Sequence, residues 1–549
     1  MSAHRFAYLT VLVILLFLLP SPVVRHSTMV AQSADEACVA STPSGSVRGV
    51  LRGGGCTYLG IPYAAPPVGD LRWKPPQPKT PWAPAVLSAT SPPPTCSLIN
   101  PPTTGQPSGN EDCLMLNIWA PSRPARAPVI VWFHTGAFQA ASANFAASNG
   151  ERFAHETNAI VVAPNYRLGP FGFLAHSAFT LEDPAYRSSG NYGLLDQRAA
   201  LVWVREHIAA FGGDPRNVTI AGTSAGSQSV SLHLVSPATA GLFHRAIMQS
   251  GVAAARWTSA AEAEAQGEQL ARALQCTDVR TAATCLRSKT RDQVLRALPL
   301  DQAQVLETGA VQWNPIVDGL EIPDQPRELY RSGAFARVPL IIGVNGHEGW
   351  VYVDRSFPDG LDTTQYEAVV HNEFGADAPA VLRLYPATAF PSPKDALSQL
   401  TGDAVFVCEA RRVARLVSQA RVDVYFYSFE HTIDAVTPGR AFHGLESNLL
   451  FGNNFGAPSN HVLTPTDVAL FRAMSGYWRR FAETGNPNAP AEAVPWPTLK
   501  LDGSPRLSDR HLVLDDVIKT ANGLRDRECR FWDRFYFRSV MGAVPASAR

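Results

Sequence analysis

Residues 217–229 of this 549-residue chain have the types and spacing that nucleophilic chemistry needs. A β-branched run is followed by Gly222-Thr223-Ser224-Ala225-Gly226 and then by a helix-forming run to Leu234. This G-x-S-x-G pattern, set between strand and helix, is typical of a nucleophile elbow. The alternative is a chance match in a surface turn. The context favours an exposed, strained Ser224 with the N–H of Ala225 directed at negative charge that develops beside it.

Acyl transfer at a serine also needs an oxyanion hole, a base and an acid that orients the base. The apolar run Val129–Phe133 leads into His134-Thr135-Gly136-Ala137-Phe138, which has the place and style of an HGGG-type loop. Its N–H groups would join that of Ala225 in holding the oxyanion. The alternative is an ordinary strand-to-loop turn.

The acid and the base have candidates later in the chain. Glu348 follows the apolar run Val338–Val344, and His443 follows the run Val422–Phe429. A lone glutamate or histidine in a loop is more often solvated or structural. The order is what favours catalysis, because serine, acid and histidine follow one another as in α/β-hydrolases.

The arrangement of apolar runs predicts an α/β fold. Helical stretches, clearest at Leu194–Ala210, separate runs of strand length, which indicates a mostly parallel sheet with helices on both faces. Besides the three runs already named, we expect strands at Ala159–Ala163, Val218–Ala221 and Ala246–Met248.

Two other regions have a biased amino-acid composition that predicts their structure. Ala260–Leu300 is rich in Ala, Gln, Leu and Arg and is predicted to be helical, forming a cap or one wall over the active site. Gly60–Pro94 is rich in proline and is predicted to run over the surface as irregular chain. No internal repeat and no linker marks a domain boundary, so we expect a single domain over residues 35–549.

Residues 1–34 are predicted to be a secretory signal peptide. A short basic start is followed by an apolar run, Phe6–Leu19, and by small residues at Ala31 and Ala34 where cleavage could occur. A run of fourteen residues, nearly all apolar, is too short to span a bilayer comfortably. An uncleaved anchor is the alternative. We therefore expect a secreted or periplasmic protein without stable membrane insertion after cleavage.

The charge pattern excludes some partners. Formal net charge is zero, and Lys and Arg are scattered, so neither nucleic acid nor an anionic membrane is an expected partner. We expect a small-molecule substrate, no metal and no other cofactor.

Eight cysteines in an exported chain predict disulfides. Pairing of neighbours would join Cys38 with Cys56, Cys96 with Cys113 and Cys276 with Cys285, and would leave Cys408 with Cys529. Spacing alone leaves other pairings open.

The chain resembles type-B carboxylesterases of the carboxylesterase/cholinesterase family over about residues 44–537. Besides the motifs above, the resemblance rests on Leu59-Gly-Ile-Pro-Tyr-Ala-Ala-Pro-Pro, Glu111-Asp-Cys-Leu-Met-Leu-Asn117, Gly193-Leu-Leu-Asp-Gln197, Phe211-Gly-Gly-Asp-Pro215, Met248-Gln-Ser-Gly251 and Cys529-Arg-Phe-Trp532. It implies the α/β-hydrolase fold, with helical insertions that form a cap or gorge.

The resemblance also implies roles. Ser224 would be the nucleophile, Glu348 the acid and His443 the base, with the oxyanion hole formed by Gly136, Ala137 and Ala225. Ser250 and Glu446 would hydrogen-bond behind the histidine, and Arg72 would pair with Glu111. The family pattern further implies the pairs Cys96–Cys113, Cys276–Cys285 and Cys408–Cys529.

Two residues depart from the family pattern. Thr223 stands where the family usually has glutamate, which would change the field near His443. Thr135 stands where the family usually has glycine, and it would be strained if that backbone needs a positive φ. The resemblance favours a secreted carboxylic ester hydrolase. A lipase, thioesterase or amidase, or a binding protein on the same fold, is the alternative.

Overall fold

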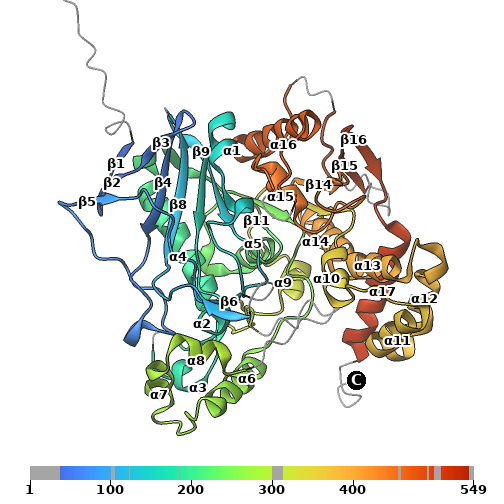
Figure 1. The fold of residues 1–549 in the computed structure, drawn as a ribbon, viewed down its shortest axis with the longest axis horizontal. Helices are drawn as coiled ribbons and strands as arrows, with labels where there is room; N and C mark the ends of the chain where they lie inside the picture. Colours follow the sequence, from blue (N-terminus) through green and yellow to red (C-terminus); the bar gives the residue numbers. More distant parts are fainter. Residues whose placement is uncertain are drawn as a thin grey trace, which may run out of the picture.

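A mixed sheet of eleven strands forms the centre of the protein in the computed structural model (Figure 1). The structure describes residues 38–100, 105–122, 124–184, 186–298, 313–455, 459–490, 494–499 and 509–542. The strand order is β16-β15-β14-β13-β12-β11-β9-β10-β8-β4-β3. The strands of this sheet are β3 (Val50–Arg52), β4 (Gly55–Pro62), β8 (Met115–Pro121), β9 (Ala127–Phe133), β10 (Ile160–Pro164), β11 (Gly213–Thr223), β12 (Arg245–Gln249), β13 (Leu340–Asn345), β14 (Val424–Phe429), β15 (Arg510–Leu514) and β16 (Lys519–Asn522).

The centre of the sheet is parallel and its edges are antiparallel. Neighbouring strands pair in parallel along the central run β10-β9-β11-β12-β13-β14-β15. The outer strands pair in antiparallel fashion, and these are β8, β4, β3 and β16. The predicted α/β fold and the six predicted strands are therefore confirmed, with ends that shift by a few residues. In a parallel sheet the carboxyl ends of neighbouring strands lie along one edge, and chemistry usually gathers there.

Each face of the sheet is covered by helices. Alternate residues of β9 face opposite sides, so Val129, Val131 and Phe133 join one apolar cluster while Ile130 and Trp132 join the other. The first cluster includes residues of α4 (Tyr192–His207), α5 (Ala225–Val235) and α14 (Cys408–Gln419), and the second those of α1 (Glu151–Thr157), α15 (Leu445–Leu450) and α16 (Pro465–Thr484).

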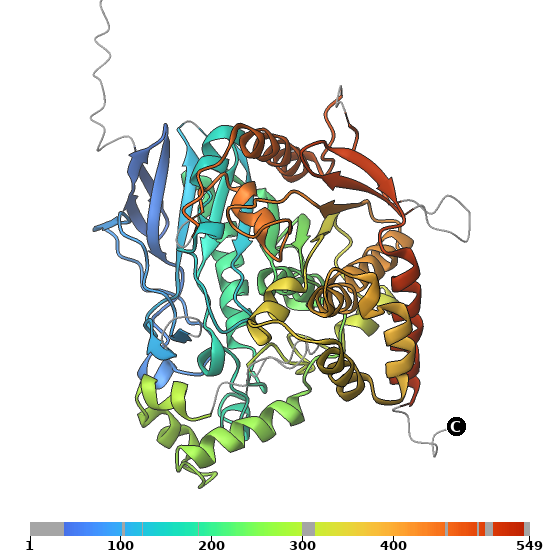
Figure 2. The same ribbon diagram turned by 45° about the vertical axis from the view of Figure 1, so that its right-hand side comes forward.

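Most of the remaining helices form two groups that Figures 1 and 2 show well apart. Residues 260–296 are helical as predicted, in three pieces: α6 (Ala260–Ala273), α7 (Ala282–Ser288) and α8 (Arg291–Arg296). The second group contains α10 (Trp350–Ser356), α11 (Thr363–Phe374), α12 (Ala378–Leu384), α13 (Pro393–Gly402) and α17 (Asp526–Gly542). The short helices α2 (Gly169–Phe173), α3 (Ser177–Thr180) and α9 (Pro326–Ser332) complete the set.

The proline-rich segment 60–94 is largely irregular, but it does more than follow the surface. Trp73 is only 1% exposed, its indole N–H donates to the carbonyl of Pro170 at 2.8 Å, and its ring stacks on Phe171. Most of residues 65–94 are exposed or half-buried, as predicted, and the buried side chain of Trp73 anchors the segment to α2.

A smaller sheet of β1 (Val39–Thr42), β2 (Gly45–Arg48) and β5 (Val86–Ser88) lies beside the main sheet, and β6 (Leu98–Asn100) pairs with β7 (Gln106–Ser108). Among the described residues, no helix has the length and apolar character needed to cross a membrane. The predicted signal peptide lies outside the described residues.

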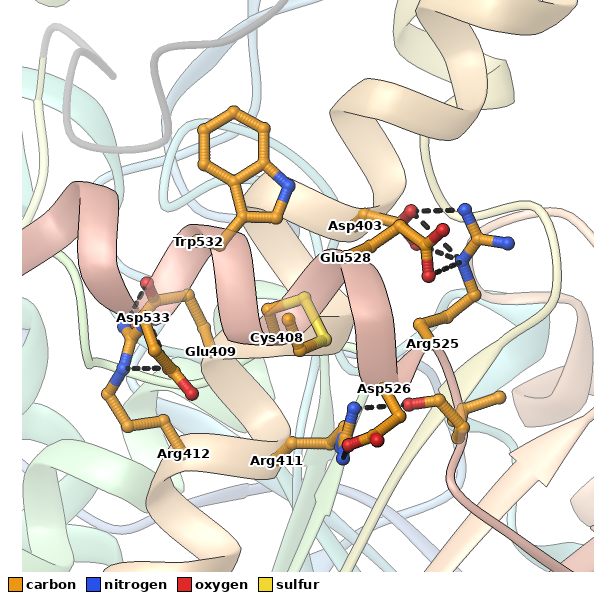
Figure 3. The surroundings of a disulfide bond; sticks show 12 residues. Asp403, Cys408, Glu409, Arg411, Arg412, Arg525, Asp526, Glu528, Trp532 and Asp533 are labelled. Atoms are coloured by element: carbon orange, nitrogen blue, oxygen red, sulfur yellow. Dashed lines mark hydrogen bonds and ion pairs between the residues drawn. A yellow bond between two sulfur atoms is a disulfide. The ribbon is translucent and has the colours of Figure 1, made fainter. Parts of the chain in front are cut away.

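Four disulfides join Cys38 to Cys56, Cys96 to Cys113, Cys276 to Cys285 and Cys408 to Cys529, which is the pairing of neighbours. The last of them joins residues 121 positions apart and fastens α17 to α14. Figure 3 shows ion pairs on both sides of it, including Arg411 with Asp526 and Arg412 with Asp533.

The oxidised protein should contain no free thiol when it is denatured and its thiols are counted with a thiol reagent.

Replacing Cys408 and Cys529 by Ser should destabilise the protein more than replacing Cys276 and Cys285. The loops contain 121 and 9 residues, and the chain-entropy model gives a difference of roughly 2 kcal/mol. Melting temperatures of the two double variants test this. Two or more free thiols, or equal destabilisation, would contradict it.

Candidate active site

Ser224 occupies a sharp turn between β11 and α5. Its φ is 56° and its ψ is −121°, a strained backbone conformation for a residue with a side chain. Its N–H donates to the carbonyl of Gln249 at 2.9 Å, which fixes the turn to the end of β12. The side chain is partly exposed, whereas Ala225 at the start of α5 is buried. The strand, turn and helix predicted around this serine are therefore present.

The two glycines of the motif lie where the backbone segments touch. A Cβ atom on Gly226 would lie 2.0 Å from the carbonyl oxygen of Phe133, and one on Gly222 would lie 2.5 Å from the carbonyl carbon of Gly226. Both distances are far below van der Waals contact. Helix α5 can approach β9 this closely only because these residues lack side chains.

His443 and Glu348 are joined although they lie 95 residues apart. Nδ1 of His443 lies 2.5 Å from Oε2 of Glu348. The glutamate is 1% exposed, and the N–H of Asn345 at the end of β13 donates to its other oxygen at 2.7 Å. The two loops that carry the pair are held together by an isolated β-bridge between His347 and Phe442.

The other ring nitrogen of His443, Nε2, is buried and has no hydrogen-bond partner among the residues that the structure describes. The imidazole is enclosed by Tyr352 of α10, at 5.5 Å between ring centroids, and by Phe406, at 4.7 Å. Burial raises the pKa of Tyr352, and a hydrogen bond with Ser224 partly offsets that rise. Tyr352 therefore contributes to the buried environment of His443 and is within the influence of Ser224.

The predicted oxyanion loop lies next to the serine turn. β9 and β11 pair in parallel with Phe133 opposite Gly222, so residues 134–138 and 223–226 leave the sheet side by side. Gly136 has a φ of 112° and Ala137 a φ of 51°, and a Cβ atom on Gly136 would lie 2.1 Å from the carbonyl oxygen of Ala140. Thr135 is not among the described residues with positive φ, so the strain considered for it is absent.

Behind the histidine lies a buried network around Glu446. Thr223 and Ser250 each donate a hydroxyl to Oε1 of Glu446 at 3.1 Å, and the Asn345 amide donates to Oε2 at 2.5 Å. Ser447 donates to the Thr223 hydroxyl at 2.8 Å. Burial, followed by the nearby Glu348 charge, raises the pKa of Glu446. Thr223 thus contributes a neutral donor where a glutamate would add a second carboxylate.

Sequence reasoning missed Asn345, Tyr352 and Phe406. Tyr352 lies four residues after Glu348 near the start of a helix, so helical spacing could have placed it on the same side. Phe406 gave no such signal. It lies in a π-helical turn, Asp403–Val407, that only the folded structure brings to His443.

The ion pair expected between Arg72 and Glu111 is present and bidentate, with N···O distances of 2.7 and 2.6 Å. The Arg72 guanidinium also donates to the carbonyl of Lys289 at 2.6 Å, so it connects the N-terminal segment to the loop between α7 and α8. Arg72 is distant from the serine turn in the sequence, and its partners Glu111 and Lys289 lie outside that turn. The ion pair therefore has a structural role.

Among the described residues, one group of side chains has the spacing of metal ligands. Ligand atoms of His431, Asp515 and Asp516 lie within 4.8 Å of one another. The two ring nitrogens of His431 lie 2.7 Å from Asp516 and 2.7 Å from Asp467, so carboxylates already occupy both positions of the ring. This arrangement fits a histidine held by hydrogen bonds to two carboxylates.

Gly226→Ala should destabilise the protein by about 3 kcal/mol or more, because neither β9 nor the turn can move aside to admit a Cβ atom. Gly476→Ala in the middle of α16 is the matched control. The nearest atom to its Cβ would be Nη1 of the Arg480 side chain, at 3.1 Å, with no backbone atom among the three nearest, so the substitution should change stability by no more than about 1 kcal/mol. Melting temperatures compare the two. A Gly226→Ala variant as stable as its parent would contradict the close approach.

Comparison with known proteins identifies the family. A sequence model described as "Carboxylesterase family" matches residues 36–532. The chain is 34% identical over 538 residues to an acetylcholinesterase of Bungarus fasciatus, covering 90% of this chain and 86% of that protein. It is 32% identical over 554 residues to an acetylcholinesterase of Electrophorus electricus, covering 87% and 84%. The chain therefore belongs to the carboxylesterase family of α/β-hydrolases.

Proposed function

We propose that this protein is a secreted serine hydrolase that cleaves carboxylic esters. The observation that carries the proposal is the bond between Nδ1 of His443 and Glu348, which leaves Nε2 as the free ring nitrogen. With Nδ1–H donated to the carboxylate, Nε2 of the neutral ring is an acceptor and can take the proton of Ser224.

In the proposed reaction, the Ser224 oxygen attacks the ester carbonyl carbon while His443 accepts the serine proton. Glu348 keeps the imidazole oriented and stabilises the imidazolium that forms. The N–H groups of Gly136, Ala137 and Ala225 hold the oxyanion. His443 then donates its proton to the leaving alcohol, and water activated by the same base releases the acid and restores Ser224.

Other acyl transfers are the alternatives. A lipase, thioesterase or amidase would use the same groups, and its substrates differ in the leaving group and acyl chain. A non-catalytic binding protein on this fold is disfavoured because serine, glutamate and histidine are all present, with the last two hydrogen-bonded. Export of the protein is supported by its four disulfides, since such bonds persist in oxidising compartments.

Within ester hydrolysis we propose a preference for neutral substrates over choline esters. The segment between the cysteines of the second disulfide, Ser97–Asp112, contains no aromatic residue that could bind a quaternary ammonium by a cation–π contact. Phe138 is 1% exposed, and the ring of Trp350 already has Arg440 at 3.7 Å from its centroid. Neither ring offers a free face to a substrate cation.

Ser224→Ala should remove ester hydrolysis, with a loss of about 10⁴-fold or more by analogy with serine protease triads. A fluorophosphonate probe should label the parent protein once, and peptide mapping should place the label on Ser224. Glu348→Gln should lower kcat by up to about 10⁴-fold while labelling remains slow but detectable. A folded Ser224→Ala variant with near-parental turnover, or a label on another residue, would contradict the assignment.

A neutral ester should be hydrolysed with a higher kcat/KM than the choline ester of the same acid. The matched pair is a choline ester and its isostere in which a tert-butyl group replaces trimethylammonium. A desolvated cation–π contact can contribute ~2 kcal/mol, so its presence would favour the choline ester by more than about tenfold. A clear preference for choline would therefore refute this part of the proposal and leave the ester hydrolase assignment intact.

A further inference from the structure

His347 is a half-buried titratable residue that the proposed reaction does not use. It lies in the loop between β13 and α10 that carries Glu348, residues 346–349, which we call the acid loop. The base loop, residues 430–444, carries His443 between β14 and α15. The backbone N–H of His347 donates to the carbonyl of Ala441 at 2.9 Å, and the N–H of Ala441 donates to Nδ1 of the His347 ring at 3.2 Å. His347 thus binds the base loop through both its backbone and its ring.

The bond to the ring fixes the protonation state of His347. A backbone N–H can only donate, so Nδ1 must be the acceptor, and the ring must be neutral with its proton on Nε2. A second proton would occupy Nδ1 and set two donors against each other, and the bond would be lost. The connection through the ring therefore exists only while His347 is unprotonated.

Charged groups from the base loop and from α13 surround His347. Burial, followed by the positive charge of Arg440, lowers the pKa of His347, whereas the carboxylate of Asp395 opposes this change. Arg440 is held in place by Asp395, at 2.8 Å, and by the ring of Trp350, at 3.7 Å from its centroid. Another acid, Glu430, has its carboxylate against the glycine that precedes His347. The ring of His347 is therefore neutral at about pH 7.

The position of Ala441 matters because His443 lies two residues further along the base loop. Nδ1 of His443 lies 2.5 Å from Glu348, so the candidate acid and base span the same two loops that His347 joins. Loss of the ring bond would let the base loop move relative to the acid loop. A displacement of about 1 Å can cost about 100-fold in rate. The ring of His347 can therefore influence the reaction through the base loop.

We propose that His347 is a positioning residue for the candidate base, and that it holds the base loop against the acid loop only while its ring is neutral. The inference rests on the proposed function and adds a second titration to it, because hydrolysis would need both His443 and His347 unprotonated. The pKa of His347 is lowered in the folded protein. The contribution of its ring is therefore fully present above about pH 6.5 and is lost as the pH falls through the lowered pKa.

The test measures kcat/KM for p-nitrophenyl butyrate, read at the isosbestic wavelength of p-nitrophenol, from about pH 4.5 to 8. His347→Asn keeps an acceptor oxygen near the place of Nδ1 but cannot take up a proton in this range. His347→Phe keeps a ring and removes the acceptor. At about pH 8, His347→Asn should retain near-parental kcat/KM, whereas His347→Phe should lose at least about fivefold, mainly in kcat, which is the equivalent of one net hydrogen bond.

The acid range separates positioning from a merely structural role. As the pH falls below about 6.5, the parent loses the ring bond and His347→Asn does not, so the ratio of His347→Asn to parent should rise by about fivefold. The ratio of His347→Phe to parent should rise toward unity over the same range, because the parent then lacks the same bond. The protonation of His443 is common to all three proteins and cancels in these ratios.

Arg440→Gln should move the change in the ratio of His347→Asn to parent, measured in an Arg440→Gln background, to higher pH. It removes the positive charge that helps to keep His347 neutral. Lys394→Gln is the matched control, because Lys394 also lies over the ring of Trp350, at 4.9 Å, but pairs with Asp354 at 2.6 Å. In that background the ratio should change over the parental pH range.

A ratio of His347→Asn to parent that stays constant with pH would overturn the inference. A folded His347→Phe variant with parental kcat/KM at about pH 8 would also overturn it. If His347→Phe does not fold, as its melting temperature would show, the ratio of His347→Asn to parent decides alone. Failure of the proposed function gives a different result: the parent would hydrolyse no ester at any pH, and the fluorophosphonate probe would leave Ser224 unlabelled.

Discussion

The hydrogen bond between His443 and the buried carboxylate of Glu348 is the interaction on which the candidate site depends. A buried charge is tolerated only when its oxygens are bonded, and here the imidazole and the N–H of Asn345 bind one oxygen each. Both contacts need the parallel pairing of β13 with β14, which sends the two loops off the same edge of the sheet. Sheet register thus fixes the orientation of the candidate base.

The packing around His443 also depends on residues near the C-terminal end of the described chain. Phe406, which packs on its ring, lies in the π-helical turn Asp403–Val407. Asp403 is buried and pairs with Arg525 at 2.5 Å, and the next turn begins with Cys408, bonded to Cys529 (Figure 3). A π-turn is rarely stable on its own and is common at functional sites. The segment leading into α17, together with α17 itself, therefore holds the aromatic wall of the site by a covalent bond and an ion pair.

Sequence alone could place those candidate residues whose positions depend on local backbone conformation. The elbow at Ser224 needs glycines at fixed offsets between strand and helix, and Glu348 follows a strand that must lie in a parallel sheet, so both could be placed in advance. Phe406 could not, because only the π-helical turn Asp403–Val407 brings its ring to His443. The burial of Trp73 could not be predicted either, since proline content reports on backbone conformation and says nothing of a single side chain.

Thr223 stands where the family usually has glutamate. It keeps the buried hydrogen-bond network around Glu446 but brings no negative charge to it. Its hydroxyl bonds both Glu446 and Ser447, so the position remains fully connected. A glutamate there would place a third carboxylate within a buried cluster that already holds Glu348 and Glu446, and like charges at such distances raise each other's pKa. With threonine, Glu446 keeps its donors and the field at the serine is less negative. An uncharged acyl or alcohol group loses nothing by this change, whereas a cationic one loses an attraction.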